Sequence, residues 1–189
     1  MPIHINMSVR SIPSGSIKFA IGWVVVFLVR LIPFRPPNIE PVLTTMMPFA
    51  KRYGWFGVFV FGFLSIAIYD AATGFLGIWT VITGAAYGFV GIGAAVFFRR
   101  REATATNFLG YAIIGTIAYD ALTGLTVGPI AFDQPFLEAL VGQIPFTILH
   151  LLGNVVFAVT VSPAIYRWVV ANSTLEMPAL TRALRLVKS

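Results

Sequence analysis

Long apolar runs, separated by short basic or proline-rich segments, dominate the chain. The longest runs without any Asp, Glu, Lys or Arg are residues 53–69, 71–98, 103–119 and 139–166. Runs near or above about eighteen residues are typical of helices that span a bilayer. Both parities of these runs are apolar, so the alternation of a membrane β-barrel strand is absent. The pattern predicts an all-α, polytopic membrane protein.

Composition agrees with this interpretation. Of 189 residues, 58% are hydrophobic and 11% are charged, whereas soluble domains average about 25% charged residues. The chain has no cysteine, which excludes disulfides and thiolate metal sites. His4 and His150 are isolated from other metal-ligating residues, so we expect neither a metal nor a cofactor.

Six helical spans account for the apolar runs. We place them at about 17–34, 39–51, 54–73, 76–98, 106–127 and 145–169. The second would be about 20 Å long, so we expect it to be tilted or partly re-entrant. Gly128-Pro129 is expected to end the fifth span, and Pro135 and Pro145 to enclose an outer loop or short helix before the sixth.

The basic residues orient these spans. With both termini inside, Arg30 and Arg35 are the only basic residues of the outer segments, so eleven of the thirteen Lys and Arg are inside. This bias predicts a cell-membrane protein with cytoplasmic termini. It also explains the net charge of +6 by topology rather than by nucleic-acid binding. The tail 175–189 is either an amphipathic segment on the membrane surface or an ordinary soluble end.

A duplicated segment offers the first candidate site. Tyr69-Asp70-Ala71-Ala72-Thr73-Gly74 recurs as Tyr119-Asp120-Ala121-Leu122-Thr123-Gly124, and the orientation places both copies at the outer ends of parallel helices. One interpretation is structural, with each glycine stopping its helix. The other is that Asp70 and Asp120 bind a solute in an outward-facing cavity, because carboxylates within membrane helices are costly. The two tyrosines are ligand contacts or interfacial anchors.

A polar stripe on the last span offers the second candidate site. Gln143, Thr147, His150 and Asn154 follow one helical face, which must point into the bundle or a wet cavity. Interhelical hydrogen bonding and ligand contact both fit. We expect Gln143 and His150 to reach the ligand and Asn154 to be structural.

The proline-rich loop after the first span, residues 35–41, offers the third candidate site. Arg35 and Asn38 would cover the outer mouth of the cavity; alternatively Arg35 simply pairs with Glu40. Trp79 is an interfacial anchor or a stacking wall. The expected substrate-binding set is Asp70, Asp120, Tyr69, Tyr119, Trp79, Gln143, His150, Arg35 and Asn38.

Six short spans, Pro-Pro-Asn-Ile-Glu-Pro at 36–41 and the Asp-x-x-Thr-Gly segments resemble the S components of energy-coupling-factor transporters. The resemblance implies a subunit that captures a vitamin-like nutrient and reorients in the bilayer. Its partners would be a transmembrane coupling protein and two cytoplasmic ATPases, so the chain itself would not be an enzyme. The family's Ala-x-x-x-Ala on the first helix is Ser16-x-x-x-Ala20 here, which departs from the family pattern at the docking surface.

Two other functions fit parts of the sequence. A stand-alone, proton-coupled secondary transporter would use Asp70 and Asp120 as titrating groups. An intramembrane aspartyl protease would use the Tyr-Asp pairs and Pro178-Ala179-Leu180, but the Gly-x-Gly-Asp of such enzymes is missing.

Overall fold

The computed structural model describes residues 15–34 and 38–176, and every regular element in this part of the chain is helical. This confirms the predicted all-α class. The elements are α1 (Ser16–Arg30), α2 (Val42–Thr73), α3 (Ile78–Phe98), α4 (Ala105–Phe132), α5 (Phe136–Ile165), the π-helical turn η1 (Tyr166–Val170) and the 3₁₀ turn η2 (Ser173–Leu175).

Four helices are long and apolar enough to cross a membrane: α2, α3, α4, and α5 continued through η1. The structure therefore supports a membrane protein. Within the described residues α1 has only 15 residues, which at 1.5 Å per residue is about 23 Å. The six-span topology and the side on which the termini lie stay predictions.

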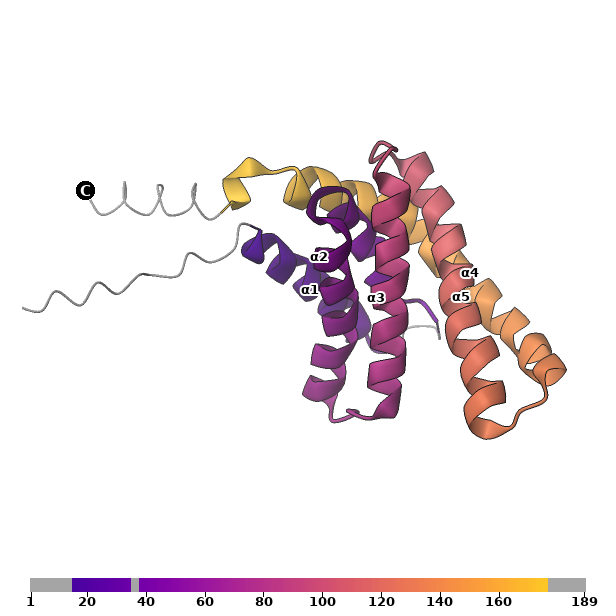
Figure 1. The fold of residues 1–189 in the computed structure, drawn as a ribbon. Helices are drawn as coiled ribbons and strands as arrows, with labels where there is room; N and C mark the ends of the chain where they lie inside the picture. Colours follow the sequence, from indigo (N-terminus) through magenta and orange to yellow (C-terminus); the bar gives the residue numbers. More distant parts are fainter. Residues whose placement is uncertain (1–14, 35–37, 177–189) are drawn as a thin grey trace, which may run out of the picture.

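Helix α2 reverses direction at Gly54, where φ is 69° and ψ is −172°. The rings of Phe49 and Phe61 stack with centroids 4.9 Å apart, although a straight helix would separate these positions by about 18 Å. Segments 42–53 and 55–73 therefore form a helical hairpin (Figure 1). The sequence placed a span boundary at this point, between residues 51 and 54.

The first arm of this hairpin, residues 42–53, is the centre of the bundle. Every residue from Val42 to Ala50 is buried, so this helix is covered on all sides. Met46 packs where a Cβ on Gly91 of α3 would lie, 2.8 Å from its sulfur. From α5, the Ser162 hydroxyl donates a 2.7 Å hydrogen bond to the Thr44 carbonyl.

The second arm packs on α3 through small residues. Cβ atoms on Gly84 and Gly88 would lie 3.1 Å from Phe63 and 2.6 Å from Phe59. The glycine-rich face of α3 thus serves contact within the chain. Figure 1 shows the second arm and α3 beside a second pair, formed by α4 and α5. The two pairs are joined by the α3–α4 connection and spread apart with distance from it.

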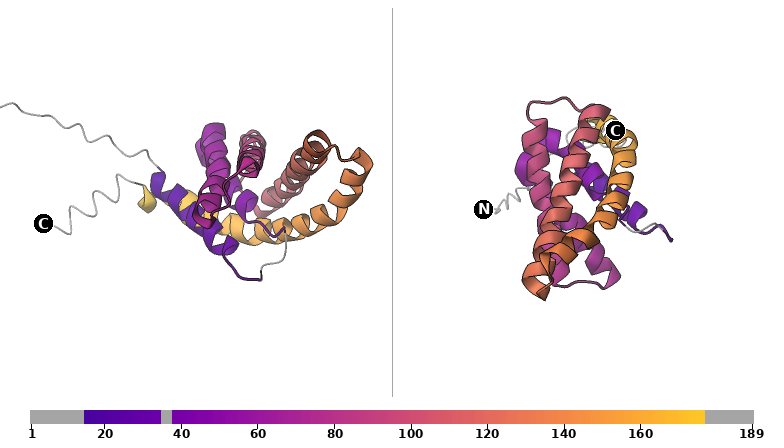
Figure 2. Two further views of the ribbon diagram at one scale, coloured as in Figure 1. Left: turned by 90° about the horizontal axis from the view of Figure 1, so that it is seen from below. Right: turned by 90° about the vertical axis from the view of Figure 1, so that its right-hand side faces the viewer.

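Two helix ends differ from the prediction. Helix α4 continues through Gly128-Pro129 to Phe132, and α5 begins at Phe136 rather than at residue 145. Proline removes one backbone hydrogen-bond donor, but an apolar surrounding strongly favours an unbroken helical hydrogen-bond pattern. Pro129 therefore stays inside α4 and Pro145 inside α5. The cost appears as curvature: α5, with Pro145 and Pro163 inside it, is visibly bent (Figure 2).

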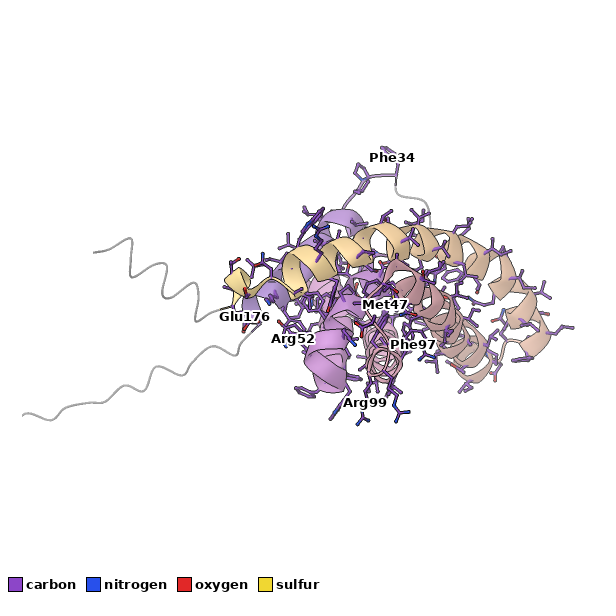
Figure 3. All side chains as sticks on the ribbon, turned by 90° about the horizontal axis from the view of Figure 1, so that it is seen from above. Phe34, Met47, Arg52, Phe97, Arg99 and Glu176 are labelled. Carbon is purple, nitrogen blue, oxygen red and sulfur yellow. The ribbon has the colours of Figure 1, made fainter. Side chains whose placement is uncertain are left out.

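Basic side chains gather at one end of the bundle, which we call the basic end. Lys51 donates to the carbonyls of Phe98 and Arg101, and Arg52 lies 3.7 Å from Glu176 (Figure 3). The loops 74–77 and 133–135 form the opposite end, because α2 and α4 run toward them from the basic end. The uneven distribution of basic residues that was seen in the sequence therefore corresponds to two different ends of the folded bundle.

Candidate functional site

A cavity of about 150 Å³ lies where the helices meet in the half of the bundle nearer the opposite end. We call it the central cavity. All five helices and the loop before α2 contribute to its lining, which is Arg30, Asn38, Glu40, Ile66, Asp70, Thr83, Tyr87, Tyr119, Phe146 and His150. Polar groups from distant parts of the sequence, from Arg30 to His150, thus converge on one small space, as in ligand sites.

Arg30, the last residue of α1, brings a cation to this cavity. Its Nε lies 3.6 Å from Glu40 Oε2, and its guanidinium carbon lies 3.9 Å from the centroid of the Tyr69 ring. Nε and Nη1 are nevertheless buried without a hydrogen bond to any described residue. A buried guanidinium group without hydrogen bonds is costly, so a ligand acceptor or water would stabilise it.

Asp70 lies in the last turn of α2 and does two things. Its backbone carbonyl accepts hydrogen bonds from the amides of Gly74 and Phe75, and Gly74 has a φ of 80°. This is a glycine helix stop, so the structural interpretation of the first repeat copy is confirmed. The carboxylate is separate: its Oδ2 accepts a 2.7 Å hydrogen bond from Thr80 and lines the central cavity.

The second repeat copy has a different structure. Gly124 lies inside α4, which continues to Phe132, so the expected helix end at this copy is wrong. A Cβ on Gly124 would overlap the Gln143 side chain. This glycine leaves room for the Gln143 side chain of α5 and does not form a left-handed turn.

Asp120 consequently lies within the bundle, away from the helix end. Its Oδ1 is 2.8 Å from Nδ1 of His150, and each side chain is 2% exposed. Asp70 and Asp120 therefore have different partners, and no hydrogen bond within the described residues joins them. A shared-proton dyad needs two adjacent carboxyl groups, which is not this arrangement.

Aromatic rings form one wall of the cavity. Tyr87 of α3 stacks on Tyr119 of α4 with centroids 4.1 Å apart, and His150 meets Tyr119 edge-on at 5.6 Å. Phe146 adds a further ring. The Tyr87 hydroxyl and His150 Nε2 are buried and have no hydrogen-bond partner among the described residues.

The polar stripe of α5 faces α4, as the sequence required. Asn154 donates a 2.8 Å hydrogen bond to Thr116, which is the structural role expected for it. Gln143 bonds Thr147 at 3.3 Å and does not line the central cavity. Both line a second hollow of about 250 Å³ beside Asp120, which we call the lateral pocket.

Other expected site residues differ in their positions. Asn38 lines the cavity in a left-handed conformation with φ of 64°, which Asn tolerates better than most residues. Tyr69 contacts the cavity only through Arg30. Trp79 is 47% exposed and stacks on Phe132, away from the cavity lining. Arg35 lies outside the described residues.

Sequence reasoning missed Arg30, Tyr87, Thr83 and Phe146 as site residues. Arg30 had a signal, because it is one of only two basic residues on the side that is poor in them. Tyr87 is a single hydroxyl-bearing ring in the apolar run 71–98, and Phe146 is one of 17 phenylalanines. Neither differs in sequence from a residue that faces lipid.

No model of a known protein family matches the chain, no curated protein does, and neither does any solved structure.

Proposed function

We propose that this chain is the solute-capturing subunit of a membrane importer and that it binds a small, water-soluble nutrient in the central cavity. One observation carries the proposal. Three residues that line one cavity have buried polar atoms without a hydrogen-bond partner among the described residues: Arg30 at Nε and Nη1, Tyr87 at its hydroxyl and His150 at Nε2. Groups left in this state cost free energy in the empty protein, and a polar solute would satisfy them together.

The position of the cavity supports capture from outside. It lies toward the end away from the basic residues, and basic loops of membrane proteins are cytoplasmic. On this orientation both termini are cytoplasmic and the solute enters from the external side of the cell membrane. The Asn38 loop and Asp70 are both part of its lining.

A finer proposal follows from the sequence resemblance to S components of energy-coupling-factor transporters. The chain would then deliver its solute by reorienting in the bilayer, with a transmembrane coupling protein and two cytoplasmic ATPases as partners. A cavity lined by all five helices of one chain supports it. Catalysis of ATP hydrolysis would belong to the partners.

Native mass spectrometry of the mildly purified chain tests the proposal. We expect a retained small molecule, and its loss in a Tyr87→Phe, His150→Gln double variant that folds as the wild type does. Co-purified ATPase subunits would support the finer proposal. A chain that retains no solute and binds none from a nutrient extract would contradict solute capture.

One observation favours a second candidate, a proton-coupled carrier that works alone. His150 lines the central cavity, whereas its partner Asp120 lines the lateral pocket. A buried carboxylate–imidazole pair between two hollows is an arrangement through which protons are relayed. Uptake by liposomes that contain only this chain, driven by a pH gradient and lost in His150→Gln, would favour the carrier over the capture subunit.

A further inference from the structure

We propose that a groove between α3 and α4 binds an anionic phospholipid, with one acyl chain in the groove and the phosphate against Arg101. The groove has a volume of about 480 Å³ and is lined by residues of these two helices and by Arg101, which follows α3. It shares no lining residue with the central cavity. The proposal therefore goes beyond solute capture and does not depend on it.

The walls of the groove are apolar and lie open at the surface of the bundle. Phe89 and Val96 of α3 and Ile114 and Leu122 of α4 line it, and all four side chains are exposed. Both helices are long and apolar enough to cross a membrane. Exposed apolar patches of this kind mark contacts with a membrane or a partner, and on spanning helices the molecules at hand are lipids.

Tyr111 of α4 holds the two walls together. Its hydroxyl donates a hydrogen bond to the carbonyl of Val90 in α3, and a Cβ on Gly93 would lie 2.5 Å from the hydroxyl oxygen. All three residues line the groove. A specific contact and the missing side chain at Gly93 thus shape the groove, so it exists before a lipid binds and costs little ordering on binding.

The groove matches the depth of one bilayer leaflet. At 1.5 Å per residue, its lining extends about 12 Å along α3, from Phe89 to Phe97, and about 17 Å along α4, from Tyr111 to Leu122. Half of a hydrocarbon core of about 30 Å is about 15 Å. A groove of this length that starts near the basic end takes most of one acyl chain from the leaflet on that side.

A guanidinium group stands at the end of the groove nearest the basic end. The Arg101 guanidinium carbon lies 4.1 Å from the centroid of the Phe97 ring, and Nη1 donates a 3.3 Å hydrogen bond to the Phe97 carbonyl. Arg101 makes no ion pair within the described residues. A guanidinium group has five N–H donors, so a phosphate can bind those that Phe97 does not use.

The surroundings of Arg101 carry an excess of positive charge. Arg99 and Arg100 are exposed and make no ion pair in the described part of the chain, and Lys51 donates a 2.8 Å hydrogen bond to the Arg101 carbonyl. Glu102 is the only acidic residue of the α3–α4 connection, residues 99–104. Four cations beside one carboxylate favour an anionic lipid over one without net charge, and on the proposed orientation this end faces the leaflet that is rich in anionic lipids.

Two lipids with the same acyl chains test the proposal: dioleoylphosphatidylglycerol, an anion, and dioleoylphosphatidylcholine, which has no net charge. The full chain is titrated with each in an uncharged detergent, and native mass spectrometry measures the affinity for the first bound lipid. We expect phosphatidylglycerol to bind at least about fivefold more tightly, which is the effect of one cation near an anionic lipid. Arg101→Gln should lower this ratio by at least about threefold.

Matched controls separate the two parts of the site. Arg167→Gln should keep the wild-type ratio, because Arg167 is an exposed arginine that does not line the groove. Ala118→Phe should weaken both lipids, because Ala118 is exposed and lines the groove, and the larger side chain would fill it. Ala72→Phe, at an exposed alanine outside the groove, should weaken neither.

The wild-type comparison of the two lipids stands on its own if a variant does not fold. Equal affinities in the wild type, an unchanged ratio in folded Arg101→Gln, or the same fall of the ratio in Arg167→Gln would overturn the proposal. So would a lipid-free dimer that Ala118→Phe separates, because a second copy of the chain would then be what covers the groove.

Discussion

Asp120 and His150 bind each other across the interface of α4 and α5, with Oδ1 2.8 Å from Nδ1 and each side chain 2% exposed. They come from positions that the sequence linked to two unrelated patterns, the duplicated Tyr-Asp segment and the polar stripe. Asp120 Oδ2 and His150 Nε2 make no hydrogen bond within the described part of the chain. The pair is therefore held by one contact and is vulnerable to the loss of either member.

Replacing both members should destabilise the fold by less than the two single replacements added together. We expect Asp120→Leu to lower the free energy of unfolding by about 3 kcal/mol, because an unpaired imidazole is left buried. The double variant Asp120→Leu, His150→Leu should lose less than the sum of the single variants. Thermal unfolding in detergent measures this, with Asp133→Asn in an exposed loop as the control. Additive losses would show that the two residues do not depend on each other.

Gly54 should be intolerant of any side chain. Its φ of 69° with ψ of −172° lies where only glycine is stable, although a Cβ there would meet nothing within 4 Å. Gly54→Ala should therefore cost about 2 kcal/mol for conformational reasons alone. Gly142→Ala is the control, because that position is equally open but has no positive φ. A Gly54→Ala protein that unfolds at the wild-type temperature would contradict the hairpin.

Gly124 should be intolerant for a different reason, which a second substitution can remove. A Cβ at this position would overlap the far end of the Gln143 side chain, which must move to another rotamer, so Gly124→Ala should destabilise the α4–α5 contact by about 1 kcal/mol. Adding Gln143→Ala should restore most of the loss, because it removes the obstructing atoms. The melting temperatures of the two single variants and the double variant measure the effect. If Gln143→Ala brought no recovery, the cost would lie in the backbone.

Glu176 should make stability depend on pH at the basic end. Its pKa is lowered, first by a hydrogen bond and charge from Lys18 and then by the charge of Arg52. A carboxyl group with a lowered pKa in the folded protein stabilises it above the ordinary pKa, and the contribution is lost as pH falls through the lowered value. Glu176→Gln should therefore unfold at a lower temperature than the wild type at neutral pH, and the gap should close in acid. A gap that persists in acid would contradict this account, as would an equal gap in Glu138→Gln.

The fold class could be predicted because it depends on apolar runs and charge spacing, which a sequence displays directly. The break at Gly54 was also visible, since basic residues interrupt the apolar pattern just before it. The ends of α4 and α5 were not, because Pro129 and Pro145 stop helices in water and are absorbed as curvature inside a bundle. The residues around a proline do not by themselves tell whether a helix ends at it or only bends.

The candidate site was only partly predictable. Asp70, Tyr119, His150 and Asn38 were expected and line the central cavity. The repeat misled at Gly124, because two identical Thr-Gly pairs serve a turn in one helix and close packing in the other. Residues such as Tyr87 acquire a role only from what faces them, which is a property of the folded chain and not of the sequence.

The burial of residues 42–50 on all sides also has a consequence for how the protein is made. A helix that enters the bilayer alone is held there by contact with lipid, and this one has no face left for lipid. Its hydroxyls at Thr44 and Thr45 would be a burden in a hydrocarbon surrounding. It becomes stable only after its neighbours enclose it, and α5, which supplies the Ser162 contact, is synthesised more than a hundred residues later. The central helix therefore depends for its place on a contact from a segment that is made long after it.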